Sequence, residues 1–264
     1  MSIILPEHTD QAIADAVQNV TQPLSISVGD TFKDLWFLTF GGISFNAEKR
    51  KIKYATELEK YKIETEKKIF AIPEPDLKDP DIQIAGQALE KSKYCIEHED
   101  LRSMFSSLVA SSMMRSKEEI IHPSFSEIIT QISPEDARAL KRFRRKERHG
   151  IITVKLTILR KETYHVLLSN VWYPYNSLDI CQKSDMIINS LTRLGLLNVD
   201  YTSHLTDNRV YIMIYNPELQ DYIESKAVDL TAQSGLKKTD YEIDIDRGII
   251  ELTPMGRNFL ECVL

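Results

Sequence analysis

The sequence predicts a mainly helical α+β protein, with helices up to residue 148 and mixed α and β structure after it. Apolar residues up to 148 recur mostly at the spacing of amphipathic helices, while β-branched residues alternate with others from residue 151. Pro and Gly mark the breaks between these patterns. We therefore expect N-terminal amphipathic helices at 1–45, a charged helical arm at 46–72, a helical core at 81–148 and an α+β domain at 151–264.

Composition limits the class of protein. A chain of 264 residues with 42% apolar content can build a core and divide into two domains. The formal charge of −6 argues against a generally basic nucleic-acid-binding surface, although a local patch is compatible with it. Three cysteines lie far apart, which is typical of reduced thiols. With no signal-peptide pattern and no apolar run long enough to span a bilayer, we expect a soluble, cytoplasmic protein.

The first 45 residues contain two amphipathic patterns. Thr9 can cap a first helix that Pro23 ends, and a second helix with several aromatic residues covers 28–40. That second helix can lie on a membrane surface or pack on the protein. Membrane-surface helices carry an excess of Lys and Arg, whereas this one has Lys33 against Asp30 and Asp34. Packing is therefore the favoured interpretation, and membrane-surface contact through 28–40 is the alternative.

The arm at 46–69 alternates Lys and Glu and has only a narrow apolar stripe. A helix of about 24 residues would be roughly 36 Å long. Such a helix either lies across the body of the protein or forms a homo-oligomer contact. The Pro-containing segment at 73–81 cannot continue it as an α-helix.

Two short phrases predict helix starts in the core. In the first, Ser124 is the expected N-cap and Glu127 has capping-box spacing; in the second, Ser133 is the expected N-cap and Pro134 takes the first helical position. The acidic residues that follow Pro134 are stabilising at the N-terminal, positive end of the helix dipole. We expect the second helix to run from 133 to 148 and to end before Gly150.

The segments 101–113, 122–129 and 132–137 together resemble the Abi-alpha (abortive infection alpha) family, over roughly residues 74–143. Members of that family are bacterial and prophage proteins associated with phage defence, so the resemblance implies a defence role. It carries no established catalytic residues. The residues that carry the two central phrases are His122, Pro123, Ser124, Phe125, Ser133, Pro134, Glu135 and Asp136.

No catalytic, cofactor-binding or metal-binding pattern stands out. The sequence has no P-loop, GxSxG or HExxH motif. His122 could act as an acid or base beside Glu127, but no second titratable partner has a fixed offset, so a His that closes a turn is the favoured interpretation. His98, Glu99 and Asp100 are consecutive and would point in different directions on a helix. We therefore expect a protein that is not an enzyme and uses no cofactor or metal.

The strongest basic cluster ends the second predicted helix. Its members are Lys141, Arg142, Arg144, Arg145, Lys146 and Arg148. Cations at a helix C-terminus are favoured by the dipole, which is sufficient to explain them structurally. The alternative is contact with an anionic partner, either phosphate or an acidic protein surface. We select the cluster as the candidate partner-binding site.

The last third contains two phrases, 191–197 and 248–260, that resemble the recognition helix and the closing strand and helix of a winged-helix fold. The interval between them is longer than a wing, and we expect an extra strand at 209–215 and a helix at 217–228 in it. The resemblance implies a winged-helix-like domain with an insertion. Residues 199–264 contain twelve acidic and six basic residues, the opposite of the balance that a DNA-docking surface needs.

These observations favour a non-enzymatic phage-defence protein that acts through contact with a phage-derived or host protein. The alternatives are a winged-helix DNA-binding regulator and an immunity protein that binds a toxin. DNA is compatible with the basic cluster but not favoured as a partner, because the C-terminal third is acidic.

Overall fold

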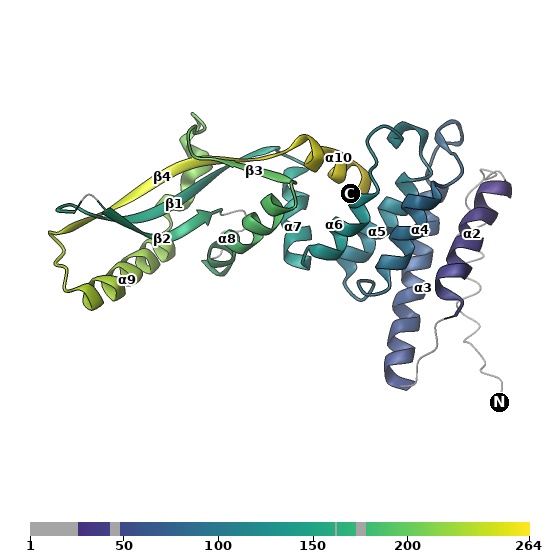
Figure 1. The fold of residues 1–264 in the computed structure, drawn as a ribbon, viewed down its shortest axis with the longest axis horizontal. Helices are drawn as coiled ribbons and strands as arrows, with labels where there is room; N and C mark the ends of the chain where they lie inside the picture. Colours follow the sequence, from purple (N-terminus) through teal and green to yellow (C-terminus); the bar gives the residue numbers. More distant parts are fainter. Residues whose placement is uncertain (1–25, 43–47, 162, 173–177) are drawn as a thin grey trace. The chain divides into compact units, whose positions relative to one another are not determined.

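The computed structural model describes residues 26–42, 48–161, 163–172 and 178–264 (Figure 1). The fold is α+β and mainly helical, as the sequence predicts. The chain divides into two compact units, Met1–Thr130 with Cys262–Leu264, and Gln131–Glu261. No helix within the described ranges combines the length and apolar character needed to cross a membrane. The helix predicted from Thr9 lies outside the described residues.

Unit 1 is helical. Its α-helices are α2 (Ile26–Phe40), α3 (Glu48–Phe70), α4 (Ile82–Ser92), α5 (Glu99–Ser111) and α6 (Ser124–Gln131), the last of which runs up to the unit boundary. Two 3₁₀ turns, η1 (Glu74–Asp76) and η2 (Arg115–Lys117), join them. The predicted helix at 28–40 and the predicted charged arm are thus present as α2 and α3. The segment at 73–81 interrupts the helices as expected, although it contains the short turn η1.

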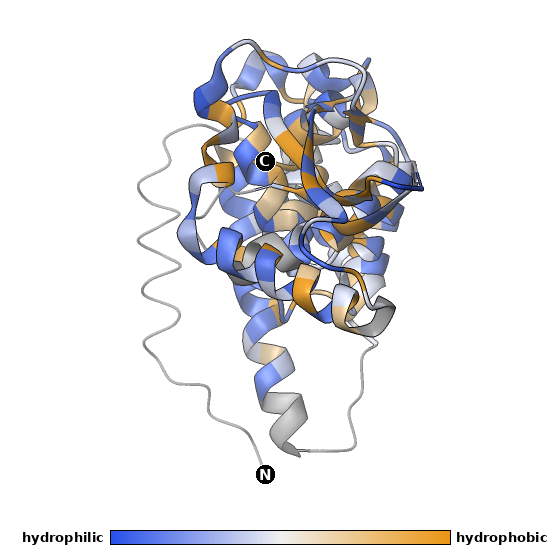
Figure 2. Cartoon of the chain, turned by 90° about the vertical axis from the view of Figure 1, so that its left-hand side faces the viewer, coloured by the Kyte–Doolittle hydropathy of each residue, from blue (hydrophilic) through white to orange (hydrophobic). Residues whose placement is uncertain are grey.

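The arm α3 packs along α5 through its narrow stripe, while hydrophilic residues dominate its remaining surface (Figure 2). Tyr61, Thr65 and Ile69 are buried in this stripe. Small residues on α5 allow the close approach: the Thr65 hydroxyl donates to the Tyr61 carbonyl at 2.7 Å, and its oxygen lies 3.1 Å from Ser106 Oγ. The arm therefore lies across the body of unit 1, and a homo-oligomer contact through its exposed side stays a prediction.

The aromatic residues of α2 are explained largely by packing. Phe32 and Phe40 are buried, and the Trp36 ring lies 4.5 Å from the Phe40 ring and 5.4 Å from the Tyr61 ring, measured between centroids. Phe37 and Leu38 are exposed on the same helix. The packing interpretation accounts for three of the aromatic residues, and membrane-surface contact through 28–40 stays a prediction.

Unit 2 is a mixed α and β unit. Its elements are α7 (Pro134–Phe143), β1 (Arg148–Ile158), β2 (Thr163–Val171), α8 (Leu178–Arg193), β3 (Leu197–Asp200), η3 (Asn208–Tyr215), α9 (Pro217–Ser234), β4 (Tyr241–Leu252) and α10 (Pro254–Val263), of which the last two residues are counted with unit 1. The four strands form one antiparallel sheet in the order β2-β1-β4-β3. The long pairing of β1 with β4 is the centre of this sheet.

The two faces of this sheet differ in character. Ile152, Val154 and Leu156 of β1 are buried, and they pack with residues of η3 and α9 such as Tyr211 and Ala227. The residues that alternate with them are polar. The opposite face carries Thr153, Lys155 and Thr157 of β1 beside Glu242, Asp244 and Asp246 of β4.

Two sequence-based expectations for unit 2 are wrong, and one strand was missed. Helix α7 ends at Phe143, so Arg148 begins β1 and Gly150 lies inside that strand. The apolar segment at 209–215 is the 3₁₀ helix η3, because Asp207 caps its start and the buried Tyr211 hydroxyl donates to the Gly248 carbonyl at 3.0 Å. Strand β2 was not predicted, since its residues do not alternate clearly between apolar and polar.

The two phrases that resemble a winged-helix fold lie side by side in unit 2. Gly195 ends α8 with a φ of 73°, and the Thr253 hydroxyl before α10 donates to its carbonyl at 2.6 Å. A Cβ at Gly256 would lie only 2.1 Å from the Leu196 carbonyl oxygen, so glycine is required at this position. The insertion between the phrases contains η3 and α9, and assignment to the winged-helix fold stays a prediction.

The two predicted helix starts differ in their outcome. Ser133 and Asp136 form a reciprocal capping box: Asp136 N–H donates to Ser133 Oγ at 3.0 Å, and Ser133 N–H donates to Asp136 Oδ2 at 2.9 Å. Ser124 is instead the first helical residue of α6, and its N–H donates to Nδ1 of His122 at 3.1 Å. Glu127 pairs with Lys91 rather than returning to the helix start. The N-cap assignment of Ser124 is therefore wrong, because the His122 ring takes the backbone donor.

Ser133→Ala should lower the free energy of unfolding by about 1 kcal/mol, because it removes the side-chain acceptor for the Asp136 N–H. Ser124→Ala is the matched control and should have a smaller effect. Chemical denaturation of both variants measures this difference. An equal loss in the two variants would contradict the assignment of the cap to Ser133 alone.

Candidate functional site

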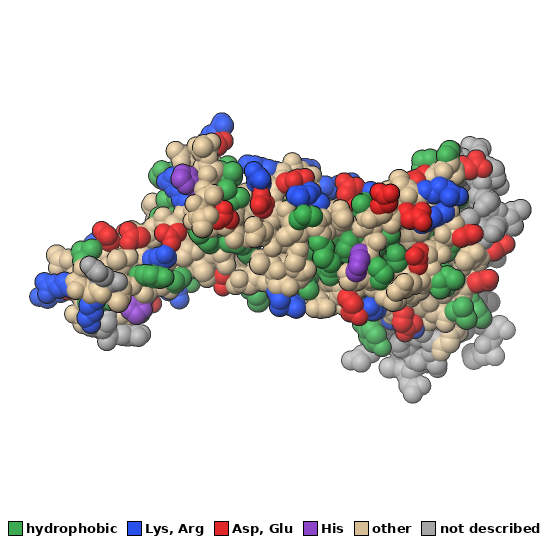
Figure 3. Space-filling model, turned by 45° about the horizontal axis from the view of Figure 1, so that its top comes forward, with side chains coloured by type: hydrophobic (Ala, Val, Ile, Leu, Met, Phe, Trp, Pro, Cys, Tyr) green, Lys and Arg blue, Asp and Glu red, His purple; other side chains and the backbone are tan. Residues whose placement is uncertain are grey.

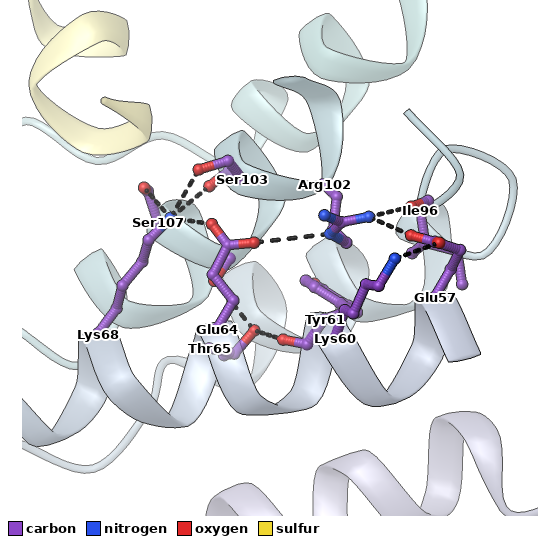
Figure 4. A network of polar contacts seen from close by, with 11 residues as sticks. Glu57, Lys60, Tyr61, Glu64, Thr65, Lys68, Ile96, Arg102, Ser103 and Ser107 are labelled. Carbon is purple, nitrogen blue, oxygen red and sulfur yellow. Dashed lines mark hydrogen bonds and ion pairs between the residues drawn. The ribbon is translucent and has the colours of Figure 1, made fainter. Parts of the chain in front are cut away.

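The most extensive buried polar network in the described residues of unit 1 joins α3 to α5 (Figure 4). Arg102 of α5 is 8% exposed and forms ion pairs with both Glu57 and Glu64 of α3. Its Nη1 also donates to the Ile96 carbonyl at 3.1 Å. Arg always carries its charge, so its burial costs desolvation energy. The two carboxylates beside it offset that cost.

Lys68 extends the network by one helical turn. Its Nζ lies 2.9 Å from Glu64 Oε1 and donates to the Ser103 carbonyl at 2.8 Å and to Ser107 Oγ at 3.0 Å. Burial favours a raised pKa of Glu64, but hydrogen bonds from Ser103 and Lys68, together with the charges of Lys68 and Arg102, lower it. A hydrogen bond from Lys60 likewise lowers the pKa of Glu57. The network is therefore charged and holds α3 in one position on α5.

His122 closes the turn before α6. Its Nδ1 lies 2.7 Å from Ser124 Oγ and accepts the Ser124 N–H, while its ring centroid is 6.1 Å from that of Phe125. Phe125 is buried, and Glu127 pairs with Lys91 at 2.6 Å. This geometry fits the turn-closing interpretation of His122. The second phrase lies in unit 2, where Asp136 is buried and Ser190 of α8 donates to its Oδ2 at 3.3 Å.

The basic cluster spans the end of α7 and the start of β1. Its six side chains, Lys141, Arg142, Arg144, Arg145, Lys146 and Arg148, are all exposed. Arg148 pairs with Glu251 at 2.7 Å, whereas Arg145 and Lys146 form no ion pair with any described residue. Because the chain changes from helix to strand within this segment, the six side chains do not all lie along one helix face. Exposed guanidinium groups of this kind bind carboxylates or phosphates through paired hydrogen bonds.

A further cation lies near the cluster and was not evident in the sequence. Arg209, at the start of η3, binds Asp207 at 2.9 Å. Hydrogen bonds from Arg209 lower the pKa of Asp207, and the charge of Lys146 adds to this effect, so Asp207 at the start of η3 lies within electrostatic range of the cluster. No periodic pattern in the sequence connects positions 146 and 209. Acidic side chains also lie near the cluster, and Figure 3 shows cations and anions interspersed on the face drawn.

His149 follows the cluster in the chain and packs against two aromatic rings that also contact each other. Its ring centroid is 4.8 Å from that of Phe143 and 5.3 Å from that of Trp172. Burial is the largest cause of a pKa lowered to about 4, and the charges of Lys146 and Arg142 lower it further. Nε2 has no hydrogen-bond partner among the described residues. The imidazole is therefore neutral near pH 7 and acts as a packed ring.

Within the described residues, no group of three or more His, Cys, Asp or Glu side chains is arranged to hold a metal ion. The row of acidic residues on β4 is engaged locally: Lys155 pairs with Asp246, and Thr157 donates to Asp244 at 2.5 Å. The basic cluster contains only Lys and Arg, which attract anions. The chemistry that it offers is anion binding.

Arg102→Met should destabilise unit 1 by about 3 kcal/mol or more, because Glu57 and Glu64 would lose the cation that compensates their partial burial. Lys53→Met is the control, since it breaks the exposed ion pair between Lys53 of α3 and Glu97, which precedes α5, and should change stability only slightly. Urea unfolding followed by circular dichroism measures both. Similar small losses in the two variants would show that the network contributes little.

The free energy of unfolding should fall as the pH decreases from about 6.5 to about 4, through the effect of His149. The folded pKa lies below the unfolded one, so the unfolded chain binds more protons in this range and acid favours unfolding. His149→Phe keeps the aromatic contacts and should flatten the pH dependence of Tm between these values. Parallel Tm curves for the wild type and the variant would contradict a buried neutral imidazole.

The sequence matches the family described as "Abortive infection alpha" over residues 53–263. No curated protein matches it. A solved structure of an uncharacterized protein from the marine bacterium Alcanivorax borkumensis SK2 is similar at 14% identity, with a TM-score of 0.33, and the alignment covers 56% of this chain and 94% of that one. The family match includes all of α4 to α10 and most of α3. This chain therefore belongs to the abortive infection alpha family.

Proposed function

We propose that this protein acts in phage defence without catalysis, by binding an anionic surface of a phage-derived or host protein through its basic cluster. The observation that carries the proposal is the exposed set of cations at the junction of α7 and β1, in which Arg145 and Lys146 lack an ion pair with any described residue. An acidic partner would supply the missing counter-charges. Family membership supports the defence role.

A protein partner is favoured over DNA because of the acidic groups beside the cluster. Glu251 binds Arg148, and Glu147 lies 3.4 Å from Arg257. A phosphate backbone has uniform negative charge, so these carboxylates would repel it. A protein surface can place cations opposite them. Mixed charge of this kind favours a specific protein contact over general attraction to nucleic acid.

A non-enzymatic role is favoured by the kind of side chain in the cluster. Arg does not release its proton in proteins, and an exposed Lys remains charged near neutral pH, so neither serves as a general base there. His149 is neutral but is half-buried and packed against Phe143 and Trp172. Cys95 in unit 1 is buried, and burial raises its thiol pKa, which is typical of an unreactive cysteine in a reducing cytoplasm.

Changing Arg144 and Arg145 to Gln should abolish protection against phage while the protein stays folded and expressed. The matched control is Lys237→Gln with Lys238→Gln, which removes the same charge from another exposed position of unit 2. Phage plating efficiency and burst size, measured across a broad panel, give the result. Unchanged protection in the Arg double variant would overturn the assignment of the cluster, and a wild type that protects against no phage would overturn the defence role.

Binding to duplex DNA at increasing salt separates the two partner classes. We expect little DNA affinity at physiological salt for the wild type. Tight DNA binding that falls steeply with salt and is lost in the Arg double variant would favour the DNA-binding regulator instead. Capture of a co-encoded toxin at the same surface would favour the immunity protein.

A further inference from the structure

Strand β2 is one edge of the sheet, and its first half is exposed. Tyr164 and Val166 are 57% and 52% exposed, and His165 between them is exposed as well. The nine residues Thr163–Val171 include no Asp, Glu, Lys or Arg. Natural edge strands are usually protected by charge, Pro or a covering segment, and this one has a high content of strand-forming residues without a charge.

The hydrogen-bonding direction of the edge follows from the neighbouring strands. Leu159 N–H donates to the Asp240 carbonyl at 3.0 Å, and Leu252 N–H donates to the Glu147 carbonyl at 3.2 Å. Backbone groups of odd-numbered β1 residues therefore point to β4, and those of even-numbered residues point to β2. Leu156 is opposite His165, so the N–H and C=O groups of His165 face β1. Those of Tyr164 and Val166 face away from the sheet.

The far end of the same edge is closed. Ser184 of α8 donates to the Asn170 carbonyl at 2.9 Å and accepts the Trp172 N–H at 3.2 Å. The other edge of the sheet, β3, has only four residues. Among the described residues, none bonds the outward backbone groups of Tyr164 or Val166. As far as the described residues go, a short, defined piece of strand edge is therefore open.

We propose that a second copy of this chain pairs with this edge, antiparallel and in one register, with the two-fold axis at His165. In that register Tyr164 of one copy is opposite Val166 of the other copy, and Val166 of the first copy is opposite Tyr164 of the other. Each such pair exchanges two backbone hydrogen bonds, so four bonds join the two sheets into one. The arrangement is isologous, which a two-fold dimer requires.

Side chains support a second copy as the occupant. The register forms two cross-strand Tyr–Val pairs, a favourable aromatic and β-branched combination. Lys155 lies 4.4 Å from the Tyr164 ring centroid and holds the ring on the open face. The hairpin turn with Arg160 and Lys161 would approach the partner's strand end at Asn170. There Asn170 Nδ2 donates to the Asp185 carboxylate at 2.8 Å, which would give each end of the proposed interface an acidic group for the partner's cations.

The dimer should be weak and dependent on concentration, because two residues per copy form only part of a standard interface. It involves unit 2 and does not use the exposed side of α3. The proposal is independent of the basic cluster, so loss of dimerisation and loss of partner binding are separate observations.

Disulfide trapping tests the register directly. In the proposed pairing the two His165 positions form a non-hydrogen-bonded pair with Cα atoms about 4.5 Å apart, which a disulfide can bridge. His165→Cys should form a covalent dimer under mild oxidation, at a rate well above the control His204→Cys, which is also an exposed histidine of unit 2. Equal cross-linking of the two variants would overturn the register.

Val166→Pro tests the backbone bonds. Proline is tolerated at an edge position whose N–H faces solvent, so the fold should be retained while the N–H that bonds the partner is removed. Sedimentation of the wild type over a concentration series should show a monomer–dimer equilibrium, and the variant should dissociate about tenfold more readily. A wild type that stays monomeric at all concentrations, or a variant with unchanged dimerisation and a native circular dichroism spectrum, would overturn the proposal.

Discussion

The ion pairs of Arg102 with Glu57 and Glu64 are the interaction on which unit 1 depends. Helix α3 is highly charged, with a stripe too narrow to fix its position by apolar contact alone. A buried guanidinium needs both carboxylates nearby, so any shift of α3 along α5 would leave a charge without compensation. Lys68 applies the same constraint one turn further along. Charge therefore provides the specificity that the small apolar stripe lacks.

Unit 2 is organised by a different constraint, the pairing of β1 with β4. That pairing divides the sheet into an apolar face under η3 and α9 and a polar face with the acidic row of β4. It also places the start of β1, with Arg148, beside Glu251 near the end of β4. The basic cluster is thus attached to a rigid strand at one end and to α7 at the other, which suits a surface that must present cations in fixed positions.

Much of the helical architecture was predictable from local signals, because caps and breaks act over a few residues. The capping box of Ser133 and Asp136 is an example of such a local signal. Ser124 shows the limit: its spacing is also suitable, but the His122 ring accepts the backbone donor, and a sequence pattern does not reveal that competition. Strand β2 and the helix η3 were missed because tertiary contacts, such as the bond from Tyr211 to Gly248, decide their conformation.

The candidate site was only partly predictable for a related reason. A run of Lys and Arg is visible in any sequence, whereas the fold of the η3 loop brings Asp207, the ion-pair partner of Arg209, within electrostatic range of Lys146. Likewise Glu57, Glu64 and Lys68 recur at intervals of seven and four residues, which places them on one helix face, but the alternating charges of α3 conceal which face is buried. The partner of that face, Arg102, lies on another helix.

The order of strands in the sheet has a consequence for how unit 2 forms. β1 and β2 are neighbours in the chain, whereas the pair of Arg148 with Glu251 joins residues 103 positions apart. During synthesis the β1–β2 hairpin is complete long before β4 emerges from the ribosome. The backbone groups of β1 that pair with β4 therefore stay unpaired while η3 and α9 are synthesised. The helices of unit 1 up to Thr130 have no such delay, which separates the maturation of the chain into an early helical stage and a late sheet-closing stage.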